Sequence, residues 1–215
     1  MNLLSRLRVF MPIIVVALAI TVSMFLTRQN AYAYTVDYRW SGNSTSYWLD
    51  STFKNQNIGW EGSFTTAVSN WNAIPNHQFS FSGAGCGVCT SNYVYAGNPG
   101  CPNPSCYAAT AKYISGGRLV QFQITLNTST GIPFYDGTQA KTIPSNYVDL
   151  KSILRHELGH SFGLCHSFYG NSSYLMGQLP MGTTRFIDQD VTNGQYYLYQ
   201  LGYAGPQPEP GGCQN

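Results

Sequence analysis

The sequence predicts an α+β fold, in which a mixed β-sheet and a few helices form a single domain. Three observations support this prediction. Segments with the apolar–polar alternation of strands lie in the first 127 residues. Helical periodicity recurs at residues 60–74, 146–164 and 188–201. The chain contains no internal repeat, and its 215 residues are enough for one globular domain of ordinary size.

Four segments are expected to be strands because they alternate and are rich in aromatic and β-branched side chains: residues 34–40, 78–82, 107–113 and 118–127. Gly116-Gly117 lies between the last two segments and favours a hairpin turn. Residues 82–104 are rich in Gly, Pro and Asn. We expect this region to be a long cross-linked loop with little regular structure.

Three segments are expected to be helices. Residues 60–74 have apolar side chains at helical spacing and end at Pro75. Residues 146–164 form the strongest predicted helix, and Gly163 is well placed to end it. Residues 188–201 begin with two aspartates, which suit the positive N-terminal end of a helix.

Few residues of the chain are charged. Asp, Glu, Lys and Arg make up 9% of the sequence, against about 25% in a typical soluble protein. After residue 33 the chain carries eight basic and nine acidic residues, a net charge of −1. A nucleic-acid partner needs a basic face, so this balance argues against one. The uncharged, Tyr-rich composition suits an extracellular protein.

Residues 1–33 have the layout of a secretory signal peptide. Two arginines precede an apolar run over residues 9–26, and Ala31 and Ala33 place small side chains at alternate positions. We expect cleavage after Ala33, which leaves residues 34–215 as a secreted domain. The alternative is a retained membrane anchor, because the 18 apolar-biased residues could nearly span a bilayer.

All six cysteines follow the predicted cleavage site: Cys86, Cys89, Cys101, Cys106, Cys165 and Cys213. An even number in an exported chain predicts three disulfides. We expect the first four, which cluster in the sequence, to pair among themselves and Cys165 to pair with Cys213. The alternative for a cluster of four is a second zinc ion held by thiolates.

The most informative segment is His156-Glu157-Leu158-Gly159-His160-Ser161-Phe162-Gly163-Leu164-Cys165-His166. Residues four apart share a helix face, so His156 and His160 can present their imidazoles to one ion. Gly163 tolerates a left-handed backbone and lets the chain turn, which can bring His166 round as a third ligand. Three protein ligands leave a fourth position open for water, as in a catalytic zinc site.

Glu157 follows the first histidine and can reach a zinc-bound water without being a ligand. As a general base it would take a proton from that water and deliver it to a leaving amine, while zinc polarises the scissile carbonyl. Three of the four histidines fall in this one pattern. The fourth, His77, has no ligand-like neighbour, and we expect it to be a surface or turn histidine.

At these residues the sequence resembles the metzincin clan of zinc peptidases, and within it the matrixin-like branch. A serine directly after the third histidine, here Ser167, is a further resemblance to matrixins. Metzincins also have a methionine in a tight turn under the zinc site, and Met176 fits that turn, with Met181 as the alternative. The likeness is loose over residues 34–202 and specific only over residues 150–176.

The resemblance implies a zincin-like fold. Its upper subdomain would hold the mixed sheet and two main helices, one of them the active-site helix, above an irregular lower subdomain with the methionine turn and a C-terminal helix. Residues 34–215 would be a metallopeptidase catalytic domain. One catalytic Zn²⁺ would be held by His156, His160 and His166, with Glu157 as the catalytic residue.

Some matrixin features are not expected. Too few histidines are available for a second, structural zinc, and the loop at residues 82–104 has no Asp or Glu to bind calcium. Disulfides are expected to cross-link that loop instead. No Cys-containing propeptide separates the signal segment from Tyr34, so latency by a cysteine on the zinc is not supported. No tyrosine follows Met176 at the spacing of an extra metal ligand.

The resulting expectation is a secreted, monomeric zinc endopeptidase that acts on protein or peptide substrates, with no membrane partner once the signal is removed. By resemblance, an extended peptide would bind along an edge strand, here residues 118–127. The side chains expected to line its S1′ pocket are Leu175, Leu179, Pro180 and Phe186. The alternative is a zinc-containing extracellular module that binds glycans or proteins without catalysis, which would not need Glu157.

Overall fold

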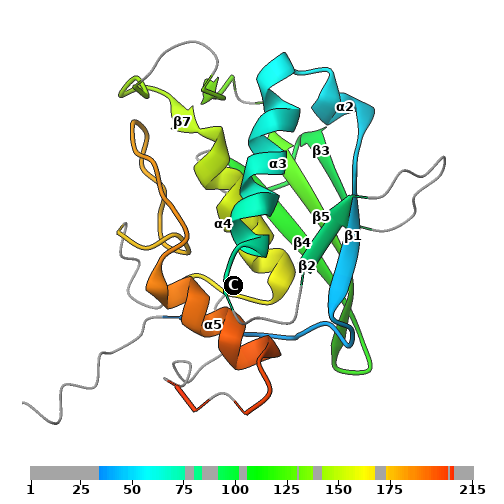
Figure 1. The fold of residues 1–215 in the computed structure, drawn as a ribbon. Coiled ribbons are helices and arrows are strands. Elements are labelled where there is room, and N and C mark those ends of the chain that lie inside the picture. Colours follow the sequence, from blue (N-terminus) through cyan, green and yellow to red (C-terminus); the bar gives the residue numbers. More distant parts are fainter. Residues whose placement is uncertain are drawn as a thin grey trace, which may run out of the picture. The chain divides into compact units, whose positions relative to one another are not determined.

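The residues described by the computed structural model belong to one compact unit of the chain, Ala33–Asn215. They are 34–75, 80–83, 92–101, 106–129, 131–137, 142–167, 173–202 and 204–205. A mixed sheet lies against two long helices in this unit (Figure 1). The α+β class is therefore confirmed. The predicted signal segment, His77, Cys86, Cys89 and Cys213 lie outside the described residues.

The main sheet has five strands in the order β2-β1-β3-β5-β4. The strands are β1 (Ser44–Leu49), β2 (Ser80–Gly83), β3 (Tyr93–Gly97), β4 (Ala108–Ser115) and β5 (Arg118–Asn127). The first four in the sheet order run parallel to one another, and β4 runs antiparallel to β5. The sheet is mixed, as predicted, and β4 forms one of its two edges.

Two helices cover one face of this sheet (Figure 1). They are α3 (Ile58–Asn72) and α4 (Leu150–Phe162), which pack against each other and against the strands. Alternate strand residues point toward them, so Val94, Phe122 and Ile124 are completely buried. This layer of helices on a sheet forms the hydrophobic core of the domain.

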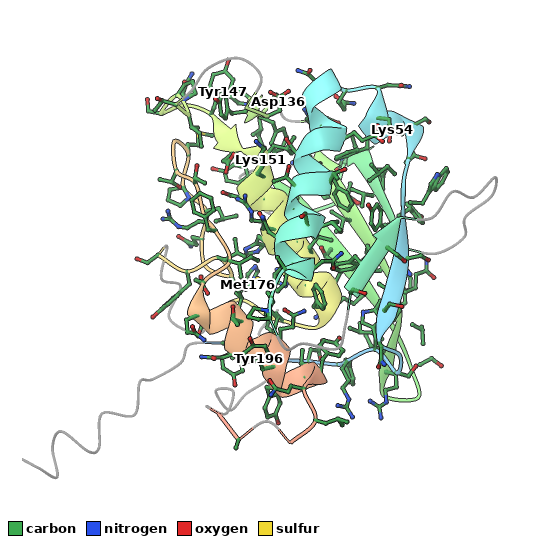
Figure 2. The ribbon with its side chains drawn as sticks, in the orientation of Figure 1. Lys54, Asp136, Tyr147, Lys151, Met176 and Tyr196 are labelled. Carbon is green, nitrogen blue, oxygen red and sulfur yellow. A yellow bond between two sulfur atoms is a disulfide. The ribbon has the colours of Figure 1, made fainter. Side chains whose placement is uncertain are left out.

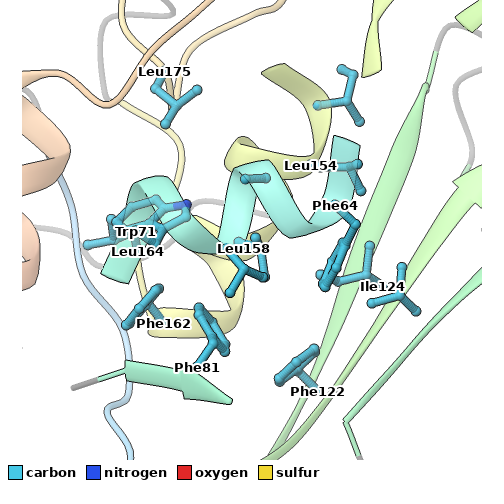
Figure 3. Close-up of a cluster of buried hydrophobic side chains, with 14 of the residues drawn as sticks. Phe64, Trp71, Phe81, Phe122, Ile124, Leu154, Leu158, Phe162, Leu164 and Leu175 are labelled. Atoms are coloured by element: carbon cyan, nitrogen blue, oxygen red, sulfur yellow. The ribbon is translucent and has the colours of Figure 1, made fainter. Parts of the chain in front are cut away.

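Aromatic side chains fix α4 within the core (Figure 3). The ring of Phe162 at the end of α4 lies 4.5 Å from that of Phe81 on β2 and 4.9 Å from that of Trp71 on α3, between centroids. The indole nitrogen of Trp71 also donates a 2.9 Å hydrogen bond to the backbone oxygen of Arg155. Each fully buried ring stabilises the fold by about 2 kcal/mol, so α4 is held firmly in place.

The three predicted helices are present: α3 is shifted by two residues toward the N-terminus, and the other two are shorter than expected at both ends. α4 begins at Leu150, because the side chain of Asp149 accepts a hydrogen bond from Ser152 N and caps the helix there. Asp188 caps the third helix, α5 (Gln189–Tyr199), in the same way. Five elements occur beyond those predicted: the strands β1 and β3 of the main sheet, and the short elements α2 (Ser51–Lys54), β6 (Phe134–Tyr135) and β7 (Val148–Asp149).

The predicted hairpin is confirmed by β4 and β5, which pair from Ala108↔Leu126 to Ser115↔Arg118. The two glycines at its tip have left-handed backbones, with φ of 55° at Gly116 and 71° at Gly117. Two left-handed residues in succession match the twist of paired strands, and glycine adopts this conformation without steric cost.

The prediction of a strand at residues 34–40 is wrong. This segment makes only two isolated bridges, Val36↔Leu164 and Trp40↔Leu119. It runs along the C-terminal end of α4 instead, where Asp37 N donates to Gly163 O, and burial does not alternate along it. The first strand of the sheet along the chain is instead β1. Its first three residues are all polar, so the sequence lacks the apolar–polar alternation that predicts a strand.

The prediction that residues 82–104 form a long loop with little regular structure is wrong in part, because β3 lies inside this region. β3 is paired with β1 on one side and with β5 on the other. Its alternation of buried Val94 and Ala96 with less buried tyrosines is a strand pattern. This strand pattern is only five residues long, and the surrounding Gly, Pro and Cys residues favour the prediction of a loop.

A third correction concerns the sheet edge. Residues 118–127 were expected to form an edge strand, but β5 lies between β3 and β4. The edge is β4, the other strand of the hairpin. A hairpin in the sequence does not show which of its strands lies inside the sheet; here the greater burial of β5 along its length reflects its interior position.

Two further predictions concern the compartment of the protein. Cys101 and Cys106 form a disulfide, and Cys165 is also disulfide-bonded. Pairing within the first four cysteines is therefore confirmed for one bridge. Among the helices that the structure describes, none combines the length and apolar character needed to cross a bilayer.

We predict that Gly163→Ala strongly destabilises the protein. Gly163 has φ of 104°, and a Cβ there would lie 2.0 Å from the backbone oxygen of Tyr38. We expect a loss of more than about 3 kcal/mol in the free energy of unfolding, measured by denaturant titration. Gly62→Ala is the control, because a Cβ at Gly62 within α3 meets nothing within 4 Å. It should be neutral or stabilising by up to about 1 kcal/mol, and equal losses in both variants would contradict the prediction.

Candidate metal centre

Two of the three predicted ligands lie one turn apart on α4. His156 and His160 project from the same side of the helix, and their ring centroids are 4.7 Å apart. His156 is buried, at 6% exposure. Because α4 is held by the aromatic core, both imidazoles start from a rigid element rather than a loop.

The third histidine is placed by the turn that ends α4. Gly163 adopts a left-handed conformation, and its N–H donates to the oxygens of Gly159 and His160. The N–H of Leu164 also donates to Gly159 O, at 3.0 Å. The chain thus reverses direction within three residues and brings His166 against the other two rings.

The segment at residues 34–40 holds this turn from outside. Thr35 and Cys165 are joined by a 3.0 Å backbone hydrogen bond, and the N–H of Asp37 donates to Gly163 O at 2.8 Å. The hydroxyl of Thr35 donates to His166 O at 2.9 Å. The free carbonyl groups at a helix end need such partners, so this segment completes the end of α4 and fixes the third histidine.

The three imidazoles converge through their Nε2 atoms. Nε2 of His160 lies 3.1 Å from Nε2 of His156 and 3.2 Å from Nε2 of His166. Nitrogen ligands around a tetrahedral zinc ion, at about 2.0–2.1 Å from the metal, are separated by about 3.3 Å. The cluster therefore has the spacing of a metal site, and the sequence prediction that these three residues come together is confirmed.

Hydrogen bonds on the other side of the rings support the same conclusion. Nδ1 of His156 lies 2.7 Å from Leu175 O, and Nδ1 of His160 lies 2.9 Å from Leu164 O. A carbonyl oxygen only accepts, so each Nδ1 carries the proton and each Nε2 has a free lone pair. Lone pairs this close repel unless a cation lies between them. The donor set therefore fits a metal ion.

Burial lowers the pKa of all three histidines. The pKa of His156 falls to about 4, first because burial disfavours the charged ring and then because His166 lies nearby. Burial and the two neighbouring imidazoles lower the pKa of His160. Burial lowers the pKa of His166, and the Lys112 ammonium adds to the effect. The rings are neutral at pH 7, the form that binds metal ions.

Glu157 directly follows His156 in α4, and its side chain is buried, at 5% exposure. Burial raises the pKa of its carboxyl group to about 7, while a hydrogen bond from Thr110 acts in the opposite direction. The Thr110 hydroxyl lies 2.6 Å from Oε2 of Glu157. A carboxyl group with a pKa near neutrality can both accept and release a proton under ordinary conditions.

Met176, labelled in Figure 2, packs against α4 at Gly159. It is completely buried, and a Cβ at Gly159 would lie 2.5 Å from its sulfur. Met176 sits in a tight turn in which Gly177 N donates to Tyr174 O, and its own oxygen accepts from Ser167 N at 2.9 Å. The alternative residue, Met181, is 39% exposed. The structure thus places Met176 against α4 at Gly159, between the two helical histidines in the sequence, and leaves Met181 exposed.

Sequence reasoning missed three residues around the cluster: Thr110, Lys112 and Arg155. Lys112 forms a 2.9 Å ion pair with Asp37. The sequence does not show which helix a polar strand residue will face, so nothing in it indicated that Thr110 and Lys112 would lie near the cluster. Arg155 did have one, because it is a charged residue on the apolar side of a helix directly before His156.

Arg155 links α4 to the segment that follows Met176. Its Nη1 donates to Arg185 O at 2.7 Å and its Nε to Asn70 Oδ1 at 2.8 Å. The guanidinium carbon also lies 5.0 Å from the ring centre of Phe186. These contacts fix residues 177–187 relative to the helix that carries two of the histidines.

No family model matches the chain, and no curated protein is significantly similar to it. The geometry and chemistry of the site therefore have to indicate its function.

We predict that the protein binds one divalent metal ion through the three histidines. His166→Ala should lower the zinc affinity at least about 100-fold, because one of the three nitrogen ligands is lost. His77→Ala is the control and should leave the affinity unchanged. The zinc content after dialysis gives the number of bound ions, and a calorimetric zinc titration gives the affinity. Equal zinc binding by His166→Ala and the wild type would contradict the prediction.

Proposed function

We propose that this chain is a zinc-dependent endopeptidase. The observation that supports this most is a buried carboxyl group, Glu157, that directly follows the first of three convergent imidazoles on the same helix. Structural zinc sites use four protein ligands, whereas catalytic sites use three and leave a position for water. Within the described ranges, the metal-ligating group has three members, His156, His160 and His166. A binding module with a merely structural metal would gain nothing from the buried Glu157.

The residues would act as follows. His156, His160 and His166 would hold the ion through Nε2, oriented by the carbonyl groups of Leu175 and Leu164. Zinc bound there would acidify water and polarise the carbonyl of the scissile bond. The carboxylate of Glu157 would take a proton from the attacking water and then deliver it to the nitrogen of the leaving amine.

We also propose a metzincin-like, and more narrowly a matrixin-like, organisation. The left-handed Gly163, the third histidine and the buried Met176 turn support it, and so does the placement of α5 after that turn. The subdomain division and the role of the methionine belong to this proposal. Secretion is part of it too, on the basis of the signal-like residues 1–33 and the disulfides.

The substrate would bind as an extended peptide next to β4. This is the edge strand nearest the site, because Thr110 on β4 touches Glu157. An added peptide strand would use the free edge of the sheet for main-chain hydrogen bonds. Leu175 is fully buried in the core, so the S1′ pocket walls would come from Leu179, Pro180 and Phe186.

We predict that Glu157→Gln abolishes peptide hydrolysis and leaves zinc binding intact. The amide keeps the shape of the side chain but cannot accept a proton, so kcat/KM should fall by at least about 100-fold. The assay is cleavage of casein and of a peptide library by the purified, zinc-loaded protein. Glu61→Gln, on the exposed side of α3, is the matched control.

The proposal fails if the zinc-loaded wild type cleaves nothing that Glu157→Gln leaves intact. It also fails if activity persists after the zinc has been removed and its absence verified. In either case a binding function would become the better explanation of the site.

A further inference from the structure

β4 passes alongside α4 at Glu157. The strand register places Thr110 beside Ile124 on β5, and Ile124 is completely buried under the helices. Residues side by side on neighbouring strands point to the same face of the sheet, so Thr110 also faces the helices. It thereby meets Glu157, which lies 47 positions away in the sequence.

The contact between these two side chains is short. Oγ1 of Thr110 lies 2.6 Å from Oε2 of Glu157 and 3.1 Å from the backbone oxygen of Glu157. A hydroxyl group has one proton, and 2.6 Å is the length of a hydrogen bond from a hydroxyl to an ionised carboxylate. Thr110 therefore donates to Oε2.

This bond makes the two carboxylate oxygens different. Oε2 of Glu157 accepts from Thr110, whereas Oε1 has no hydrogen-bond donor in the part of the chain that the structure describes. A glutamate side chain turns about three bonds, and fixing one oxygen restricts all three. Because Glu157 is buried, water competes little for this bond.

We propose that Thr110 is a positioning residue, whose hydroxyl holds Oε2 of Glu157 and leaves Oε1 to exchange the proton with water and the leaving amine. This inference rests on the proposed peptidase function and adds the group that orients its base. Thr110 acts through Glu157 and does no chemistry itself. Since Thr110 belongs to β4, the strand proposed to pair with the substrate also orients the base.

The test compares Thr110→Val, which keeps the shape and loses the hydroxyl, with Thr110→Ser, which keeps the hydroxyl. In the zinc-loaded protein, Thr110→Val should lower kcat about 10- to 100-fold with little change in KM. Thr110→Ser should stay within about threefold of the wild type. Thr125→Val, a threonine of β5 on the opposite face of the sheet, is the matched control. If Thr110→Val does not fold, Thr110→Ala replaces it.

A crystal structure of each zinc-loaded variant gives a second readout that is independent of activity. Glu157 should have one carboxylate orientation in the wild type and Thr110→Ser, and a changed or multiple orientation in Thr110→Val. An unchanged orientation, an unchanged kcat, a loss of zinc, or equal losses in the Val and Ser variants would each overturn the inference. If the wild type has no activity, the peptidase proposal fails, and the structures alone decide the role of Thr110.

Discussion

The arrangement of the site depends on the left-handed backbone conformation of Gly163, at which the chain leaves α4. The helix supplies two histidines by its own periodicity, but a helix that continued would carry the third away from them. The left-handed backbone at Gly163 turns the chain, and the close approach of Tyr38 O leaves no room for a side chain. Residues 34–40 then bond the freed carbonyl groups, so the turn is held on both sides.

The protein itself supplies the contacts that orient the histidine rings. Carbonyl groups from two different parts of the chain orient the rings of His156 and His160, and burial keeps the rings neutral. Bringing lone pairs together in this way is unfavourable by itself, and the packing of Trp71, Phe81 and Phe162 around α4 stabilises the arrangement. The core and the site are therefore energetically linked.

Local patterns allowed much of this to be predicted. The three histidines, the three helices and the Gly116-Gly117 hairpin each follow from spacing or from a backbone need within a short segment. Features that depend on contacts between residues far apart in the sequence could not be predicted from local patterns. β3 is a strand because β1 and β5 lie beside it, and the inner place of β5 is set by the sheet as a whole. The contact of Thr110 with Glu157 exists only once the sheet and α4 have come together.

The hydrogen bond between Thr35 and His166 joins residues 131 positions apart in the sequence. Helices such as α4 form within about a microsecond, whereas contacts between distant segments must await the closure of the whole intervening chain. The third ligand is thus expected to reach its place among the last steps of folding. A chain that is only partly folded would hold two of the three imidazoles and would bind metal weakly. Retention of metal would then distinguish completely folded molecules from incomplete ones during maturation.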